Sequence, residues 1–162
     1  MLSLTRKTDY ALVALARLAE AGPEQDKPVS VRQIAEEYSL PRPLLMNIFK
    51  DLQRAGLVRS TRGAHGGYEL AESSEQIHLA SVIQAIEGPM SLVICCDEQE
   101  ADAPCSSCTL VDRCPVTVAM RQVNQRMVEF LRQITIRDLM TREVDVLLPN
   151  VGCIKKPSTT QS

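Results

Sequence analysis

Residues 29–70 read VSVRQIAEEYSLPRPLLMNIFKDLQRAGLVRSTRGAHGGYEL, and this stretch decides the fold. Near its start, Ser30 can cap a helix, and Gln33 stands three residues later, where its side chain can return a hydrogen bond. Apolar residues then recur at helical spacing over residues 44–52 and stop before Gly56, a residue suited to the end of a helix. We therefore predict two helices joined by a tight, proline-containing link, as in a helix-turn-helix.

A short hairpin is predicted after the second helix. Residues 57–62 have the pattern of a strand, residues 63–67 form a glycine-rich turn, and residues 68–70 form a returning strand. The order helix, helix and hairpin is that of a winged helix-turn-helix. Its wing tip would carry Arg62 and His65, where the glycines permit a close approach to a DNA backbone or minor groove.

Basic residues gather on the same segment. Residues 41–68 contain five Lys or Arg and one acid, although the whole chain has a net charge of −2. This excess gives the segment an affinity for phosphate. A solvated helix surface can carry the same pattern, but two helices followed by a wing favour DNA binding. The candidate DNA-binding residues are Arg42, Met46, Asn47, Lys50, Arg54, Arg62 and His65.

The composition fits one small, mostly helical domain with an extension. The chain has 162 residues, 44% of them hydrophobic and only 3% aromatic, so its core must consist of aliphatic side chains packed between helices. No run of 18 apolar residues is present, and we expect a cytoplasmic protein without a membrane segment. Early in the chain we expect an amphipathic helix whose apolar face consists of Leu12, Val13, Leu15, Ala16 and Ala19.

The second half of the chain is expected to extend the domain and to dimerise. A further amphipathic helix over residues 77–87 ends at Gly88, and Pro115 suits the first position of a long helix. A long helix on a small domain favours a symmetric homodimer. Its apolar residues repeat at alternating spacings of four and three, which is a heptad seam of Val116, Met120, Val123, Met127, Phe130 and Ile134. The expected units are a winged helix-turn-helix domain (1–88), a cysteine-rich loop (89–114), a dimerisation helix with a short C-terminal helix (115–148) and a flexible tail (149–162).

Six cysteines stand in a chain with no secretory signal, so we expect thiols or metal ligands rather than disulfides. Five of them fall within 20 residues, which brings several thiolates within reach of one iron or zinc site. Cys114 also precedes the long helix, whose N-terminal partial charge favours a thiolate. A zinc-binding or thiol-redox interaction module is the alternative, although the second CxxC pair of a usual zinc site is missing. The candidate metal ligands are Cys95, Cys105, Cys108 and Cys114.

Several stretches together resemble the IscR/NsrR family of iron-sulfur winged-helix regulators. They are LTRKTDYA from residue 4, RGAHGGY from residue 62, EGP from residue 87, a cysteine pair with five intervening residues, and ITIRDL from residue 134. The resemblance implies one cluster, [2Fe-2S] or [4Fe-4S], held by Cys95, Cys108 and Cys114. The interval between Cys108 and Cys114 fits the family, but twelve residues separate Cys95 from Cys108, so Cys96 or Cys105 can replace Cys95.

The family takes a fourth ligand from one of two places. One is a His three residues after the last Cys, where this chain has Thr117, a poor ligand. The other is the first helix of the partner subunit, where Asp9 matches the carboxylate of NsrR-like members; alternatively, Asp9 only complements the helix dipole.

The implied function is a dimeric repressor or activator whose affinity for double-stranded DNA depends on the cluster and so on iron, redox state or nitric oxide. The sequence contains no Ser/His/Asp or paired-carboxylate arrangement, and the βαβ pattern of a thiol oxidoreductase is absent. We therefore expect neither an enzyme nor a small-molecule substrate.

Overall fold

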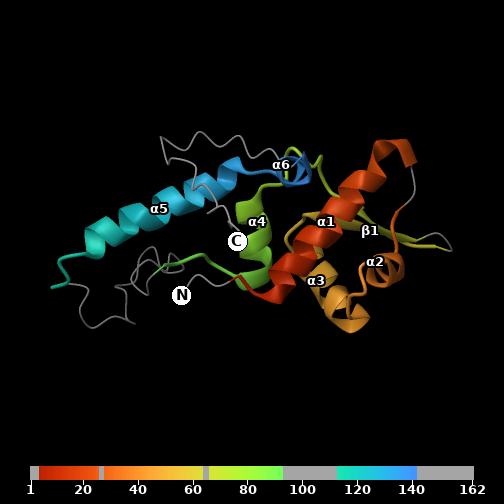
Figure 1. The fold of residues 1–162 in the computed structure, drawn as a ribbon, viewed down its shortest axis with the longest axis horizontal. Coiled ribbons are helices and arrows are strands. Elements are labelled where there is room, and N and C mark those ends of the chain that lie inside the picture. Colours follow the sequence, from red (N-terminus) through yellow and green to blue (C-terminus); the bar gives the residue numbers. More distant parts are fainter. Residues whose placement is uncertain (1–3, 26–27, 64–65, 93–112, 142–162) are drawn as a thin grey trace, which may run out of the picture.

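The computed structural model describes residues 4–25, 28–63, 66–92 and 113–141. Within these ranges the chain is mostly helical and has one two-stranded antiparallel sheet (Figure 1). No helix in the described ranges is long and apolar enough to cross a membrane. In chain order the elements are α1 (Arg6–Gln25), α2 (Val31–Glu37), α3 (Arg42–Arg54), β1 (Val58–Thr61), β2 (Gly67–Leu70), α4 (Leu79–Glu87), α5 (Thr117–Gln133) and α6 (Ile136–Thr141).

The predicted ends of the two central helices are confirmed. Ser30 accepts a hydrogen bond from the backbone N–H of Gln33, and the Gln33 side chain accepts one from the N–H of Ser30, which makes a capping box at the start of α2. At the end of α3, Gly56 has a φ of +74°, which lets the N–H of Leu57 reach the carbonyl of Leu52 at 3.0 Å. These two local motifs fix the start of α2 and the end of α3.

The helix α3 begins earlier than its apolar pattern suggests. The predicted link included Pro43, whereas the helix already starts at Arg42 and holds Pro43 in its first turn. Proline is tolerated there because the first N–H groups of a helix have no partner within the helix. The link between α2 and α3 therefore consists of residues 38–41 and lies earlier in the chain than the predicted break at residues 40–43.

The wing is a hairpin that is fastened to the start of α2. Strands β1 and β2 pair with Val58 opposite Leu70 and Thr61 opposite Gly67. The backbones of Val29 and Tyr68 exchange two hydrogen bonds of 3.0 and 2.8 Å. A Cβ atom on Gly67 would lie 2.6 Å from the carbonyl oxygen of Val29, so only glycine permits this close approach.

The core lies between α1, α3 and the hairpin. Phe49 on α3 is fully buried, and its ring lies against Tyr68 of β2 with centroids 4.4 Å apart. The helix α1 crosses the centre of the domain and contacts α3, α4 and α6 (Figure 1). A displacement of α1 would therefore directly change its packing against α3.

The last two helices differ from prediction in two ways. The helix α5 begins at Thr117 rather than at Pro115, because residues 114–117 form a turn closed by the Thr117 N–H and the Cys114 carbonyl at 3.4 Å. At its other end, Ile134 leaves the helix in an extended conformation and packs with α4. The chain then returns through Ile136, which is 1% exposed, into the core of the N-terminal domain.

Candidate functional site

Most of the predicted DNA-binding residues of α3 lie on its exposed surface, away from its buried side. That buried side consists of Leu45, Ile48, Phe49 and Leu52. Of the candidates, Met46 is half-buried and contacts the core, while the others are exposed. Arg54 forms an ion pair with Asp51 at 3.3 Å but remains 80% exposed. The structure therefore leaves a polar and basic helix surface of Arg42, Asn47, Lys50 and Arg54 open to a ligand.

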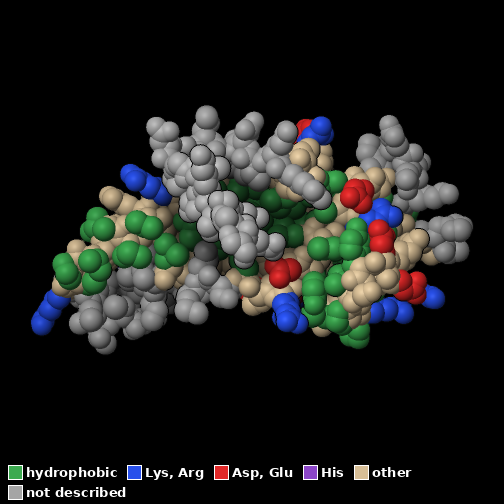
Figure 2. Space-filling view, in the orientation of Figure 1, with side chains coloured by type: hydrophobic (Ala, Val, Ile, Leu, Met, Phe, Trp, Pro, Cys, Tyr) green, Lys and Arg blue, Asp and Glu red, His purple; other side chains and the backbone are tan. Residues whose placement is uncertain are grey.

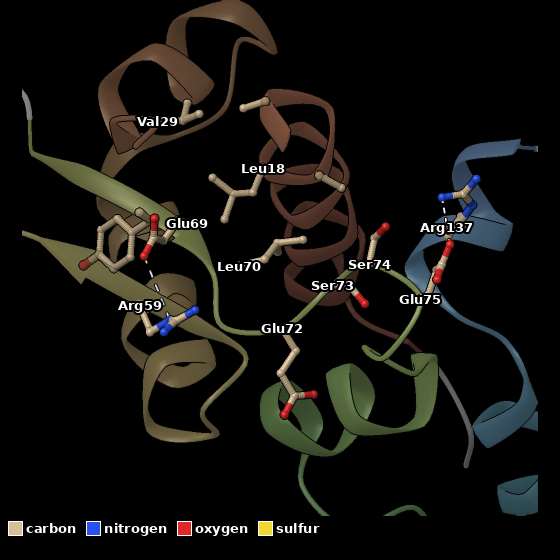
Figure 3. A pocket seen from close by; sticks show the side chains of 13 residues that line it. Leu18, Val29, Arg59, Glu69, Leu70, Glu72, Ser73, Ser74, Glu75 and Arg137 are labelled. Atoms are coloured by element: carbon tan, nitrogen blue, oxygen red, sulfur yellow. Dashed lines mark ion pairs between the residues drawn. The ribbon is translucent and has the colours of Figure 1, made fainter. Parts of the chain in front are cut away.

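On the wing, the two arginines of the hairpin have different surroundings. Arg62 is exposed beyond the end of β1, whereas Arg59 donates to the carbonyl of Ala71 at 2.9 Å and lies 3.9 Å from Glu69. Figure 3 shows Arg59 at the edge of a cavity of about 510 Å³ between α1, the hairpin and residues 72–75. Arg62 is thus the more accessible base for DNA, and the predicted contact His65 lies outside the described residues.

A carboxylate joins the end of α4 to the start of α1. The backbone N–H and the hydroxyl of Thr5 donate to Oε1 of Glu87 at 2.9 and 2.7 Å, and the hydroxyl of Thr8 donates to the same oxygen. Thr8 is fully buried. Burial raises the pKa of Glu87, but these hydrogen bonds outweigh it, so the pKa lies below its ordinary value. The sequence motifs around residues 4 and 87 therefore meet in space.

The Glu87→Gln variant tests this junction through its pH dependence. Because the pKa of Glu87 is lower in the folded chain than in the unfolded chain, the Glu87 carboxylate stabilises the fold at pH values above the unfolded pKa. This stabilisation disappears as the pH falls from about 4.5 through the folded pKa. We expect the melting temperature of the variant to lie below that of the parent at pH 7, and this difference to shrink in acid. Thermal melts followed by circular dichroism measure it, with exposed Glu72→Gln as the control. A difference of constant size down to acid pH would contradict the assignment.

The described cysteine, Cys114, lies in the turn before α5. The Thr117 side chain and the backbone at Val116 and Thr117 lower the pKa of the Cys114 thiol, although burial opposes them. The thiol is free and half-buried. This confirms neither metal nor cluster, but a stabilised thiolate is the form in which cysteine binds iron or zinc.

The other predicted ligands lie either outside the described residues or on α1, away from Cys114. Cys95, Cys96, Cys105 and Cys108 lie outside the described ranges. Asp9 is exposed in the first turn of α1, and Figure 1 places the start of α1 far from the start of α5. Across the described part of the chain, no group of three Cys, His, Asp or Glu side chains can hold a metal ion.

One buried polar residue on α5 was missed by the sequence analysis. Asn124 is 4% exposed, and its side chain hydrogen-bonds the backbone of Met90 and Leu92. The sequence did carry a signal for this residue, because Thr117, Asn124 and Leu131 stand seven residues apart. These three residues form the side of α5 that faces its own protomer.

The residues of the predicted heptad seam differ in burial: some pack inside the protomer and others are exposed. Phe130 packs inside the protomer against Leu79, Ile83 and Ile134. Val116 and Val123 are 54% and 50% exposed, and Figure 2 shows hydrophobic side chains gathered over the N-terminal half of α5. Among the described residues of the seam, Val116 and Val123 are therefore the most exposed to another molecule.

Comparison with known proteins agrees with this architecture. Residues 4–142 match the Rrf2 family, described as iron-dependent transcriptional regulators. Protein rrf2 of Nitratidesulfovibrio vulgaris is 33% identical over 159 residues, covering 98% of this chain and 99% of the relative. The HTH-type transcriptional regulator IscR of Vibrio parahaemolyticus is 32% identical over 140 residues, covering 86% of this chain and 78% of the relative.

A solved structure shows the same fold. CymR, the global cysteine regulator of B. subtilis, is similar with a TM-score of 0.65 and 28% identity, over 88% of this chain and 98% of that chain. The predicted mostly helical, winged helix-turn-helix fold is thereby confirmed, as is the expectation that these proteins are regulators rather than enzymes. Because the match spans nearly all of the described residues, the chain belongs to the Rrf2 family of transcriptional regulators.

Proposed function

We propose that this regulator is a homodimer that binds double-stranded DNA through α3 and the wing, with an affinity set by an iron-sulfur cluster. The observation that carries the DNA part is the division of α3 into one fully buried side and one exposed side bearing Arg42, Asn47, Lys50 and Arg54. In a helix-turn-helix the second helix enters the major groove, with its N-terminal residues against base edges. Asn47 is suited to adenine, and the basic residues are suited to guanine or phosphate.

Replacement of Lys50 or Arg62 by alanine should weaken binding to all DNA sequences alike. Each lost phosphate contact should lower the slope of log affinity against log salt by about one. Asn47→Ala should instead relax sequence preference. Fluorescence anisotropy on a duplex selected from a random pool measures these effects, and Arg32→Ala is the control because Arg32 is exposed on α2 and paired with Glu36 at 2.7 Å. If Lys50→Ala and Arg62→Ala both keep the affinity and salt slope of the parent, the surface is wrongly assigned.

The described cysteine, Cys114, has the chemistry of a ligand to an iron-sulfur cluster. The pKa of the Cys114 thiol, in the turn before α5, is lowered, and four further cysteines precede it within 20 residues. Cys95, Cys108 and Cys114 would hold the cluster, with Cys96 or Cys105 as the substitute for Cys95, and Asp9 of the partner subunit would complete it. A bound cluster supplies iron-sulfur bonds that respond to iron supply, oxidation or nitric oxide.

Contacts within the chain link the end of α4 to α1 and, through α1, to the DNA-binding helix α3. Asp9 follows Thr8, which Glu87 holds at the start of α1, and the cysteine loop leaves α4 directly after Glu87. Because α1 packs on α3, a ligand bond at Asp9 that exists in only one state would bias the position of the recognition helix. A bond that forms in only one of the two states is what a conformational switch requires.

The second candidate is a zinc or thiol-redox site in the same loop. It is favoured by the lowered pKa of Cys114, which also suits zinc or disulfide chemistry. Anaerobic purification followed by iron and sulfide analysis, absorption and EPR spectroscopy separates the two. A brown protein with equimolar iron and sulfide supports the cluster, whereas a colourless protein that holds zinc or no metal contradicts it.

A further inference from the structure

The cavity of about 510 Å³ beside the wing has no part in the proposed function. Its walls come from α1, both strands of the hairpin, the segment that joins β2 to α4, and α6 (Figure 3). Volumes of about 300–1,000 Å³ are typical of sites that hold small organic molecules. The size of the cavity therefore suits a small organic ligand, and its lining decides the chemistry of that ligand.

The buried part of the lining is apolar. Leu18 and Ala21 on α1 and Val29 before α2 line the cavity and are only 4–7% exposed. Two half-buried residues, Ala19 and Leu70, extend this apolar wall. A hydrocarbon group that displaces water from such a wall is stabilised by the hydrophobic effect.

The rim of the cavity is charged and carries more acid than base. Figure 3 shows two ion pairs on opposite sides of Leu18 and Leu70. One joins Arg59 to Glu69 at 3.9 Å, and the other joins Arg137 to Glu75 at 2.8 Å. A third carboxylate in the lining, that of Glu72, forms no ion pair within the described part of the chain. Both guanidinium groups are thus already paired, and the lining has a net negative charge.

We propose that this cavity binds a small organic cation, namely a primary amine with a hydrocarbon body. The hydrocarbon body lies against Leu18 and Leu70, and the ammonium group interacts with the carboxylates of the rim, above all with that of Glu72. An ammonium group has only donors, which suits a carboxylate with free acceptors. An anionic ligand would instead meet the excess negative charge. This inference goes beyond the proposed function, because it requires neither the cluster nor DNA.

The first test uses three probes that share one carbon chain length and differ in charge at pH 7: hexylamine, hexanol and hexanoate. Each is titrated into the ¹⁵N-labelled full-length protein, and amide signals are followed by NMR. Hexylamine should shift the signals of residues that line the cavity, with a Kd on the order of 1 mM for so small a ligand. Hexanol should bind about fivefold more weakly, since exposed ion pairs contribute modestly, and hexanoate should not saturate. Equal affinity for all three probes, or no saturable shift with hexylamine, would overturn the proposal.

Glu72→Gln tests the role of the carboxylate. This variant should bind hexylamine no more tightly than hexanol, whereas its affinity for hexanol should equal that of the parent. The matched control is Glu20→Gln, which removes an exposed carboxylate of α1 that does not line the cavity. It should keep the parent's preference for hexylamine. If Glu72→Gln also keeps that preference, the ammonium group is wrongly placed.

Ala19→Leu tests the place of the hydrocarbon body. It puts a larger side chain into the lining and suits a helix, because leucine is nearly as good a helix former as alanine. Hexylamine and hexanol should both bind at least about tenfold more weakly, since the lost contact area lowers hydrophobic stabilisation. Thermal melts show whether the variant folds as the parent does. Parental affinity for both probes in the folded variant would place their binding outside the cavity and overturn the proposal. If Ala19→Leu does not fold, Ser74→Leu replaces it, because Ser74 lines the same cavity outside the helices.

Discussion

Cys114→Ser is expected to abolish cluster binding while leaving the protein folded. The surroundings at Thr117 and Val116 lower the pKa of the thiol at this position, whereas a serine hydroxyl stays neutral and is a poor iron ligand. After anaerobic reconstitution the variant should hold less than about a tenth of the parent's iron and sulfide. Its metal-free form should melt with the parent, because Cys114 lies in a surface turn and outside the buried core.

The matched control for this prediction is Cys153→Ser. Cys153 is the sixth cysteine and stands 39 positions after Cys114, beyond the cysteine-rich segment 89–114. This variant should bind iron and sulfide as the parent does. If Cys114→Ser also binds them fully, Cys114 is not a ligand, and the loop must be interpreted as a zinc site or a thiol switch.

The parts of the fold that could be predicted from the sequence depend on neighbours in the chain. The capping box at Ser30 and the helix end at Gly56 each use residues within six positions, so their residue types already specify the geometry. The buried face of α1 was only partly predicted: Leu15 is fully buried as expected, but the small residues Ala11 and Ala14 are equally buried. Close packing of helices selects small side chains there, and that choice depends on tertiary contacts.

The same distinction separates the two kinds of site residue. The exposed surface of α3 followed from its periodicity, since its opposite face had to be apolar. The hydrogen bonds of Glu87 span 79 and 82 positions, and those of Asn124 span 32 and 34. No spacing rule links residues so far apart, because their meeting depends on how α1, α4 and α5 pack. The sequence could therefore predict the exposed surface of α3 better than the long-range contacts of Glu87 and Asn124.

Val123→Glu is expected to separate the proposed dimer into folded monomers. Val123 is half-exposed in the isolated protomer, and Met127 lies one turn further along the same flank of α5. In a symmetric dimer this flank would meet its own copy, so each substitution is present twice. Burial of an unpaired carboxylate costs several kcal/mol per ion, so the dissociation constant should rise at least about a thousandfold. Analytical ultracentrifugation over a range of concentrations measures the change.

Val118→Glu is the control that locates the interface. Val118 is 70% exposed and stands five residues before Val123, which places it about 140° away around the helix. Its flank also carries the exposed residues Gln122 and Gln125. Val118→Glu should therefore remain dimeric under conditions in which Val123→Glu is monomeric. The reverse result would place the dimer contact on this polar flank. The C-terminal half of the predicted seam could not then supply the dimer contact instead, because Phe130 already packs within its own protomer.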